Sequence, residues 1–456
     1  MKQLDLNIVR EYDIRGVAGK TLFAENGYNI GRALGTKALA NGSKVINVGY
    51  DGRVSSPEIS SELIRGVIES GCDVNDVGLV PSPGLYFSVF HLDVDYGIMV
   101  TASHNPKEYN GFKIISKKEI FYGVALKDFA KFVNEGNFAE GRGVHNKVDV
   151  KQDYLKKLQQ ELEGVDLSDV RIAWDPACGA AGEIVASLVE NISGTNFLIN
   201  ENIDGSFPAH DPDPTIEENL SQLKQLVADN SCNIGLAFDG DADRIGVIDD
   251  EGEVLWGDQL VTLYAKDLLQ DHPGSTVIAD IKASKVFADK VSEFGGKPLI
   301  WKTGHSLIKA KMKEEGAPLA GEMSGHVFFS DKGNFGYDDG IYAAVRLIRI
   351  IVQKNIKLSD YRKSLPQTFS TKEEKVACPD DQKFTVVNRL KDYLGGEGID
   401  FMDIDGVRVE SDKGWWLIRA SNTSPYLTTR CEGFSEADLE VLKNELQTSL
   451  QKCYQQ

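Results

Sequence analysis

Short apolar runs alternate with helical stretches through the first 365 residues, and this alternation limits the folds that the chain can adopt. Six runs have the length and residue types of buried strands: 45–49, 98–100, 170–174, 234–238, 277–279 and 318–320. Three segments between them carry apolar residues at helical spacing: 56–70, 216–229 and 259–269. The pattern predicts an α/β fold with mixed, mostly parallel sheets that are covered by helices on both faces.

Three of these strands end on an aspartate: Asp51, Asp175 and Asp280. Each is followed some tens of residues later by a second strand that ends in a polar loop, and these loops lie at 101–106, 239–244 and 321–326. The repeat predicts three similar α/β domains, at 1–146, 147–250 and 251–365. Ligands of such sheets bind at the carboxyl ends of strands, where all three loops fall.

The rest of the chain has a different pattern. Two short alternating runs lie at 407–410 and 415–419, and the pattern after them predicts a helix at 436–452. We expect residues 366–456 to form a smaller α+β domain. A chain of 456 residues exceeds the roughly 250 to 300 at which a single core stops growing, so four domains fit its length.

Composition and charge exclude several classes of protein. Hydrophobic residues make up 41% and charged residues 26%, as in ordinary globular proteins. The net charge of −19 argues against nucleic acid or an anionic membrane as the main partner. No apolar stretch approaches the roughly 18 residues of a membrane span, and the N-terminal residues lack a signal-peptide core. The six cysteines are scattered without a CxxC pair, which favours reduced thiols. We therefore expect a cytoplasmic protein; the sequence leaves its oligomeric state open and is compatible with a monomer.

Asp239, Asp241 and Asp243 alternate in Phe-Asp-Gly-Asp-Ala-Asp-Arg between two apolar runs. Carboxylates about 4 Å apart repel by about 4 kcal/mol per pair at an effective dielectric of about 20, so a positive charge must share this turn. Ligands that are all oxygen favour Mg²⁺, Ca²⁺ or Mn²⁺ over zinc.

Two alternatives compete with this interpretation. An EF-hand would use the same three aspartates and a residue near Asp250, but its turn glycine is replaced by Arg244 and the flanks are β-favouring runs instead of long helices. A merely solvated acidic turn is the second alternative.

The loop Thr-Ala-Ser-His-Asn-Pro at 101–106 offers a nucleophile, Ser103. Asn-Pro disfavours an immediate helix and favours a turn, which predicts an exposed Ser103 at a strand end near backbone amides. The same pattern fits a serine that only hydrogen-bonds its own turn, and His104 fits a structural role. No Gly-x-Ser-x-Gly elbow supports an acyl-transfer serine.

Four segments occur here in one order: Thr-Ala-Ser-His-Asn-Pro, Asp-Gly-Asp-Ala-Asp-Arg, Gly-Glu-Met-Ser-Gly-His at 321–326, and Arg-Ala-Ser-Asn-Thr-Ser-Pro at 419–425. Arg-Glu-Tyr-Asp-Ile-Arg-Gly at 10–16 precedes them. With these five motifs the whole chain resembles the α-D-phosphohexomutases, and most closely their bacterial phosphomannomutase/phosphoglucomutase branch.

The resemblance implies four domains around one cleft, each contributing a loop. Ser103 would be the residue that carries a phosphoryl group, and Mg²⁺ would bind Asp239, Asp241, Asp243 and a phosphoserine oxygen. The implied reaction interconverts hexose 1-phosphate and hexose 6-phosphate. Glucose or mannose 1,6-bisphosphate would be its intermediate and activator.

The resemblance also implies roles for the remaining candidates. Cations near the transferring phosphoryl group would be Arg15, Lys113, Arg244 and Lys282. The distal phosphate would be bound by Arg419, Ser421, Asn422, Thr423 and Arg430, although a polar turn in a small domain would look similar. Glu322 and Ser324 would contact sugar hydroxyls. His305 and His326 are candidates for proton transfer or phosphate contact, with Lys113 as another candidate base. Tyr12 is a weaker candidate, and Asp13 fits a partner of Arg15.

The sugar and the reaction have alternatives. Met323 stands where phosphoglucosamine mutases usually carry Gln, which favours mannose and glucose as the sugars. These differ only at carbon 2, so a site that contacts the hydroxyls at carbons 3 and 4 would admit both. A phosphoglucosamine mutase, a metal-dependent sugar-phosphate phosphatase and a non-catalytic sugar-phosphate or calcium-binding protein are the other functions that the sequence allows. In each case except calcium binding, the partner is a small sugar phosphate.

Overall fold

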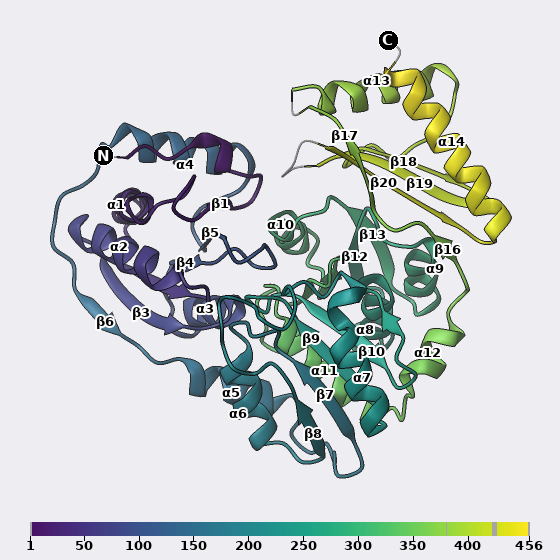
Figure 1. Cartoon of the computed structure of the whole chain (residues 1–456), viewed down its shortest axis with the longest axis horizontal. Coiled ribbons are helices and arrows are strands. Elements are labelled where there is room, and N and C mark those ends of the chain that lie inside the picture. Colours follow the sequence, from purple (N-terminus) through teal and green to yellow (C-terminus); the bar gives the residue numbers. More distant parts are fainter. Residues whose placement is uncertain (1, 380, 422–425, 455–456) are drawn as a thin grey trace. The chain divides into compact units, whose positions relative to one another are not determined.

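The computed structural model describes residues 2–379, 381–421 and 426–454, and it divides into two compact units. The first unit contains Met1–Gly257 and Ser324–Asp360. The second unit contains Asp258–Met323 and Tyr361–Gln456. Figure 1 labels helices and strands of both units where there is room.

A six-stranded sheet opens the first unit, in the order β1-β5-β4-β2-β3-β6. Its strands are β1 (Ile14–Val17), β2 (Val45–Tyr50), β3 (Asp73–Leu79), β4 (Tyr96–Val100), β5 (Tyr109–Ser116) and β6 (His145–Lys147). β2 pairs in parallel with β3 and β4, whereas β5 is antiparallel to both β4 and β1. Every residue of β4 is buried, as a continuous apolar run in a central strand requires.

Helices of the first sheet's domain are α1 (Ala24–Ala40), α2 (Ser56–Glu69), α3 (Ser82–His91) and α4 (Gly123–Glu135), after a short 3₁₀ helix η1 (Leu6–Ile8). α1 and α2 pack on each other and lie side by side in Figure 1. Gly31 of α1 makes this approach possible, because a Cβ there would lie 2.2 Å from the backbone oxygen of Leu63. Gly66 of α2 faces the oxygen of Tyr28 in the same way, at 2.1 Å.

A second sheet of the first unit has the order β11-β10-β9-β7-β8. Its strands are β7 (Arg171–Asp175), β8 (Thr195–Leu198), β9 (Ile234–Phe238), β10 (Ile245–Asp249) and β11 (Val254–Leu255). The helices that accompany it are α5 (Lys151–Gln160), α6 (Gly182–Glu190), η2 (Glu217–Leu220) and α7 (Ser221–Asn230). β15 (Val327–Phe329) and α11 (Gly340–Gln353) also belong to this unit.

The second unit holds two further sets of strands. β12 (Thr276–Asp280) pairs in parallel with β13 (Lys297–Trp301) and β14 (Leu319–Gly321). The last sheet is antiparallel and contains β16 (Phe369–Ser370), β17 (Glu374–Ala377), β18 (Val407–Ser411), β19 (Gly414–Ala420) and β20 (Tyr426–Gly433). Ile281, just after β12, packs with Trp415 and Leu417 of β19 in one buried cluster.

The helices of this part of the chain are α8 (Gly257–Asp271), α9 (Lys285–Glu293), α10 (His305–Glu315), α12 (Leu358–Ser364), α13 (Lys383–Gly396) and α14 (Glu436–Tyr454). α13 and α14 cover one face of the antiparallel sheet, as Figure 1 shows, and share its hydrophobic core.

The predicted α/β architecture of three similar domains with a smaller C-terminal domain is confirmed, and its sheets are mixed. One predicted helix needs correction. The segment 216–229 does not form a single α-helix, because the 3₁₀ helix η2 precedes α7, which begins only at Ser221.

Candidate active site

The aspartate loop 239–244 joins two antiparallel strands, β9 and β10, whose residues Phe238 and Ile245 are paired. Asp239, Asp241 and Asp243 are fully buried, and their carboxylate oxygens lie within 4.8 Å of one another. The EF-hand alternative is wrong because strands flank the loop instead of helices. The solvated-turn alternative is also wrong, since no carboxylate of the three is exposed.

Lys113 of β5 reaches into this carboxylate cluster. Its Nζ lies 2.7 Å from Asp241 Oδ2 and also contacts Asp243. Burial alone would lower the pKa of Lys113, but the charges of Asp241 and Asp243 outweigh it and raise this pKa above its usual value. Lys113 is therefore an ammonium at neutral pH and offsets part of the cluster's negative charge.

The pKa values of the three carboxylates are shifted in different directions. Burial, together with the charges of its two neighbours, raises the pKa of Asp239 well above its usual value. Burial acts in the same direction on Asp241, but the Lys113 ammonium outweighs it and lowers the pKa of Asp241. Burial and the charge of Asp241 raise the pKa of Asp243.

The cluster fits a divalent cation. Asp241 Oδ1 is buried and has no hydrogen-bond partner within the described residues. A buried carboxylate oxygen without a donor is costly, and a hard cation would satisfy it. The three aspartates supply only oxygen ligands, which Mg²⁺ prefers.

Ser103 lies just beyond β4, and its Oγ donates to Asp239 Oδ2 at 2.6 Å. The backbone N–H of Ser103 donates to Thr101 Oγ1 at 2.9 Å, and its φ of 51° is in the left-handed region. That conformation costs about 1 to 2 kcal/mol for a residue with a Cβ. The predicted exposure of Ser103 is wrong: the residue is 1% exposed, because the aspartate loop from a distant part of the sequence covers it.

Two arginines flank the serine and the carboxylates. Arg15 of β1 donates to Asn105 Oδ1 at 2.5 Å and pairs with Asp13, as its sequence position suggested. Arg244, the last residue of the aspartate loop, has its Nε 3.9 Å from Asp239 Oδ2. Tyr12 is half-buried, directly before this part of the chain.

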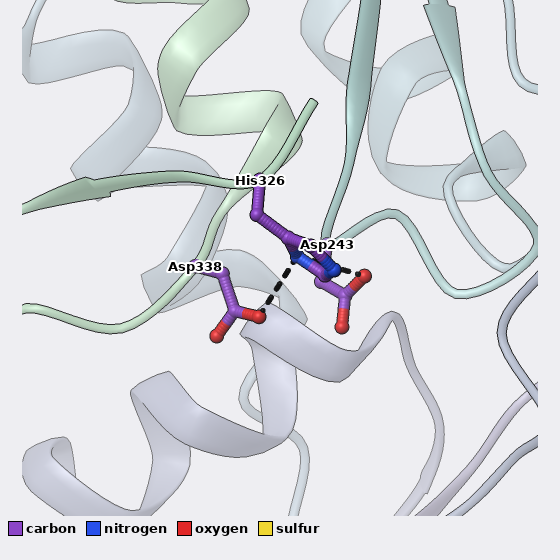
Figure 2. Close-up of side chains that lie close together, drawn as sticks. All are labelled: Asp243, His326 and Asp338. Atoms are coloured by element: carbon purple, nitrogen blue, oxygen red, sulfur yellow. Dashed lines mark ion pairs between the residues drawn. The ribbon is translucent and has the colours of Figure 1, made fainter. Parts of the chain in front are cut away.

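His326 lies between two carboxylates in Figure 2, those of Asp243 and Asp338. Its Nδ1 is 3.0 Å from Asp338 Oδ2 and 3.5 Å from Asp243 Oδ1. Its Nε2 accepts from Arg244 Nε at 3.1 Å. Because an arginine can only donate, Nε2 carries no proton in this arrangement, and the imidazole proton is on Nδ1, facing the carboxylates.

In the second unit, Lys282 follows the carboxyl end of β12. Its Nζ is 3.4 Å from Glu373 and 3.7 Å from Asp280. Burial opposes the charge of Lys282, but Glu373 and Asp280 raise its pKa, so the ammonium is retained. Glu322 Oε1 accepts from the backbone N–H of Gly304 at 2.5 Å, and this contact fixes the turn before His305, the buried first residue of α10.

Arg419 is the penultimate residue of β19 and lies close to the same turn. Its Nη2 is 2.9 Å from Asp405 Oδ2, and this oxygen also accepts from the backbone N–H of Thr303 at 3.1 Å. Ser421 donates its backbone N–H to the oxygen of Tyr426 at 3.0 Å. The guanidinium of Arg430 lies 5.9 Å from the centre of the Trp415 ring. Asn422 and Thr423 lie outside the described residues.

The predicted site residues therefore form two groups. The first unit brings together Ser103, the three aspartates, Lys113, Arg15, Arg244 and His326. Ser324 also belongs to the first unit, whereas Lys282, His305, Glu322, Arg419, Ser421 and Arg430 belong to the second.

Several polar partners of these residues were not predicted. Ser82 Oγ donates to Asp241 Oδ2 at 2.5 Å, and Thr101 Oγ1 lies 3.2 Å from the same oxygen. Asp338, Glu373 and Asp405 lie against His326, Lys282 and Arg419. The position of an aspartate at the end of a predicted strand could have identified further buried polar residues, because Asp51, Asp175 and Asp280 are all buried. Nothing in the local sequence distinguishes Asp338, Glu373 or Asp405 from other acidic loop residues.

Comparisons with known proteins match the chain domain by domain. Models of the phosphoglucomutase/phosphomannomutase α/β/α domains I, II and III match residues 6–128, 152–252 and 256–369, and the C-terminal domain model matches 373–449. A phosphomannomutase/phosphoglucomutase from Pseudomonas aeruginosa is 42% identical over 448 residues, which cover 98% of this chain and 96% of the relative. A phosphoglucomutase from Neisseria meningitidis is 37% identical, with 99% and 98% covered.

The crystal structure of a phosphoglucomutase/phosphomannomutase family protein from Burkholderia thailandensis has a TM-score of 0.92 and 36% identity, and it covers 99% of this chain and 98% of its own. Four matching domains in this order define an enzyme that transfers a phosphate group intramolecularly. The chain belongs to the phosphoglucomutase/phosphomannomutase family, within the α-D-phosphohexomutases.

We find no helix that could cross a membrane in the described part of the chain. None of its helices combines the length and the apolar character that a transmembrane span needs.

Proposed function

We propose that this enzyme interconverts hexose 1-phosphate and hexose 6-phosphate, with mannose and glucose as its sugars and Ser103 as the phosphoryl carrier. One observation carries the proposal: Ser103 Oγ lies 2.6 Å from Asp239, in a cluster that also contains Lys113. A nucleophile beside acidic ligands and a fixed cation suits a phosphoryl group better than an acyl group. The names of the relatives from Pseudomonas and Neisseria support the sugars.

The charge of a phosphoserine explains the need for a metal. A phosphate on Ser103 would stand beside the Asp239 carboxylate, and two such anions repel unless a cation lies between them. We propose that Asp239, Asp241 and Asp243 hold Mg²⁺ there. When bound, Mg²⁺ would supply charge stabilisation to the phosphoryl oxygens.

The chemistry consists of two transfers. In the first, the bond between Ser103 Oγ and phosphorus breaks while a substrate hydroxyl oxygen forms its bond to phosphorus, which yields a 1,6-bisphosphate. In the second, the reoriented bisphosphate returns its other phosphoryl group to Ser103. Added glucose or mannose 1,6-bisphosphate would activate the enzyme by phosphorylating Ser103.

Each transfer needs a group that accepts the hydroxyl proton. Lys113 is unsuited to this role because its raised pKa keeps it protonated, so we assign it to charge stabilisation with Arg15 and Arg244. We propose that Arg244 turns its donors to the phosphate, which leaves His326 Nε2 to accept the proton. The adjacent Asp338 and Asp243 would stabilise the resulting imidazolium.

The second unit would bind the rest of the substrate. We propose that Arg419, Ser421 and Arg430, with Asn422 and Thr423, bind the phosphate that is not transferred. Glu322 and Ser324 would contact the sugar hydroxyls, and Lys282, His305 and Tyr12 would complete the site. The domain limits at 146, 250 and 365, a cytoplasmic location and a monomeric state also stay predictions.

³¹P NMR of the protein with Mg²⁺ and a trace of glucose 1,6-bisphosphate tests the function. Mannose 1-phosphate, glucose 1-phosphate and glucosamine 1-phosphate are supplied in separate tubes, with Ser103→Ala as the control. We expect the mannose and glucose signals to move to the 6-phosphate position without release of inorganic phosphate, and the variant to be inactive. Release of inorganic phosphate alone would indicate a phosphatase, and conversion of glucosamine 1-phosphate alone would indicate a different sugar.

A further inference from the structure

The loop that carries Ser103 has backbone oxygens that find no hydrogen-bond donor within the loop. Ser103 has a left-handed backbone, and the peptide oxygen that follows it points at the aspartate loop, where a Cβ on Gly240 would lie 2.5 Å from this oxygen. Within the loop, Asn105 N–H donates to the oxygen of Ala102 and Tyr109 N–H to that of Pro106. These local bonds leave the oxygens of Ser103, Asn105 and Tyr109 to be satisfied by other groups.

A single buried side chain, Arg53, satisfies these oxygens. Its Nη2 donates to the oxygens of Ser103 and Asn105, each at 2.6 Å. Its Nη1 donates to the oxygens of Pro106 and Tyr109 at 2.8 and 3.1 Å. All four terminal N–H groups of one guanidinium are therefore directed at the backbone of residues 103–109, and the side chain has no exposed surface.

Arg53 is itself held firmly in place. Its Nε lies 3.2 Å from Asp51 Oδ2, and this oxygen accepts from Thr101 Oγ1 at 2.7 Å. Thr101 Oγ1 in turn accepts from the backbone N–H of Ser103. The guanidinium also lies 5.2 Å from the centre of the Phe207 ring, which comes from the next domain in sequence. Arg53 thus connects the strand end at Asp51 to both sides of the serine.

We propose that Arg53 is a positioning residue for the reaction: it holds the Ser103 backbone in the left-handed conformation that places Oγ beside Asp239 and the metal-binding carboxylates. Its terminal donors reach only backbone oxygens of the loop, so it would act on the reaction through the position of Ser103. The proposal rests on the proposed function of Ser103, but the conformation of the loop can be measured without any reaction.

The geometry requires an arginine at this position. Four carbonyl oxygens are reached at once because the guanidinium is planar and presents its donors as a rigid fork. A lysine would keep the charge beside Asp51, but its single ammonium has three donors at one point and cannot span residues 103–109. Arg53→Lys should therefore keep the fold and lose the position of the serine.

The test compares Arg53→Ala and Arg53→Lys with the wild-type enzyme by hydrogen exchange and by kinetics. Arg171→Ala is the matched control, because Arg171 also donates to a backbone oxygen, that of Asn230 at 2.6 Å, and lies 5.0 Å from a phenylalanine ring. Hydrogen exchange measured by mass spectrometry reports on peptides that cover residues 101–109. Turnover is followed from glucose 1-phosphate with glucose 1,6-bisphosphate present, with and without added guanidinium chloride at millimolar concentration.

We expect faster exchange at 101–109 in both Arg53 variants and a fall in kcat of about 100-fold, the effect of a misplacement of about 1 Å. KM should change little, because the substrate contacts remain. Guanidinium should partly restore kcat to Arg53→Ala and not to Arg171→Ala.

Unchanged exchange at 101–109 together with kcat near that of the wild-type enzyme in a folded Arg53 variant would overturn the proposal, and so would an equal loss of kcat in Arg171→Ala. If Arg53→Ala does not fold, Arg53→Lys gives the same comparison. A wild-type protein that converts no hexose phosphate would contradict the proposed function instead, while the exchange data would still decide whether Arg53 holds the loop.

Discussion

Asp241 is the residue at which the aspartate loop meets the domain that carries the serine. Its Oδ2 accepts from Ser82 and Lys113 of that domain, while its Oδ1 faces the cluster without a hydrogen-bond donor among the described residues. Removing its charge should therefore affect both the metal and the ammonium of Lys113.

We predict that Asp241→Asn lowers kcat by at least about 100-fold and raises the Mg²⁺ concentration needed for half-maximal activity, because an amide is a weaker ligand than a carboxylate. Kinetics over a Mg²⁺ titration measure both effects. Asp250→Asn is the control: Asp250 holds Ser359 through both carboxylate oxygens and stands where an EF-hand would need its last ligand. A normal Mg²⁺ requirement in Asp241→Asn would refute the assignment of the metal site.

Arg419 should act on binding more than on the chemical step. We predict that Arg419→Ala raises KM by about 10- to 100-fold and changes kcat by less than about fivefold, because the phosphate that we propose it binds is not the one transferred. Lys391→Ala removes a cation near Asp403 in the same domain and should leave both constants unchanged. A fall in kcat without a change in KM would place Arg419 at the transferred phosphate.

At the scale of helices and strands, the sequence correctly predicted those elements that their own residues determine. Continuous apolar runs predicted β4 and β9 because central strands are buried on both faces. The burial of Ser103 could not be predicted, because it depends on residues more than a hundred positions further along the chain. The same holds for the insertion of Lys113 between Asp241 and Asp243, which the family resemblance placed only near the phosphate.

The pairing of α1 with α2 depends on a helix surface without side chains. We predict that Gly31→Ala lowers the stability of the protein by about 1 to 3 kcal/mol, because its Cβ would overlap the backbone oxygen of Leu63, which cannot move alone. Gly395→Ala in α13 is the control, since a Cβ there meets nothing within 4 Å and alanine favours the helix. Calorimetry should show a lower Tm only for Gly31→Ala.

The start of α11 should make stability depend on pH. Asp339 accepts from the N–H of Tyr342 and from the hydroxyl of Tyr154, both at 2.8 Å, and burial raises its pKa from 3.8 to about 6. Between pH 3.8 and about 6, Asp339 is mostly protonated in the folded state and mostly ionised in the unfolded state. Its contribution to the free energy of unfolding is therefore present at low pH and is lost as pH rises through about 6. The full effect is about 3 kcal/mol.

We predict that Asp339→Asn removes this loss of stability at rising pH, because the amide oxygen can accept both hydrogen bonds without a charge. Relative to the wild-type protein, the variant should gain stability between pH 4.5 and 7.5, as measured by urea unfolding. Asp166→Asn is the control: hydrogen bonds from Ser168 lower the pKa of that exposed carboxyl below its usual value, so the stability difference between this variant and the wild-type protein should stay constant between pH 4.5 and 7.5. A constant difference between Asp339→Asn and the wild-type protein would contradict the prediction.

At the scale of the whole molecule, all six cysteines are buried and unpaired, and no disulfide joins any of the described domains. Burial raises the pKa of Cys72 and of Cys431 to about 12, so these thiols are scarcely ionised at neutral pH. The stability of the chain therefore comes from its packed cores.

We predict that a thiol reagent such as dithionitrobenzoate modifies none of the cysteines of the native enzyme at pH 8 and all six after unfolding in guanidinium chloride. The Tm should be the same with and without dithiothreitol. Rapid modification of a native thiol would indicate that one of the cores opens readily.

The ammonium of Lys113 between Asp241 and Asp243 makes it an internal placeholder for the metal. Three buried carboxylates with no counter-charge would tend to force their loop open whenever the metal left. With Lys113 already among them, the loop keeps a counter-charge when the proposed metal is absent, so the folded loop should not depend on that metal.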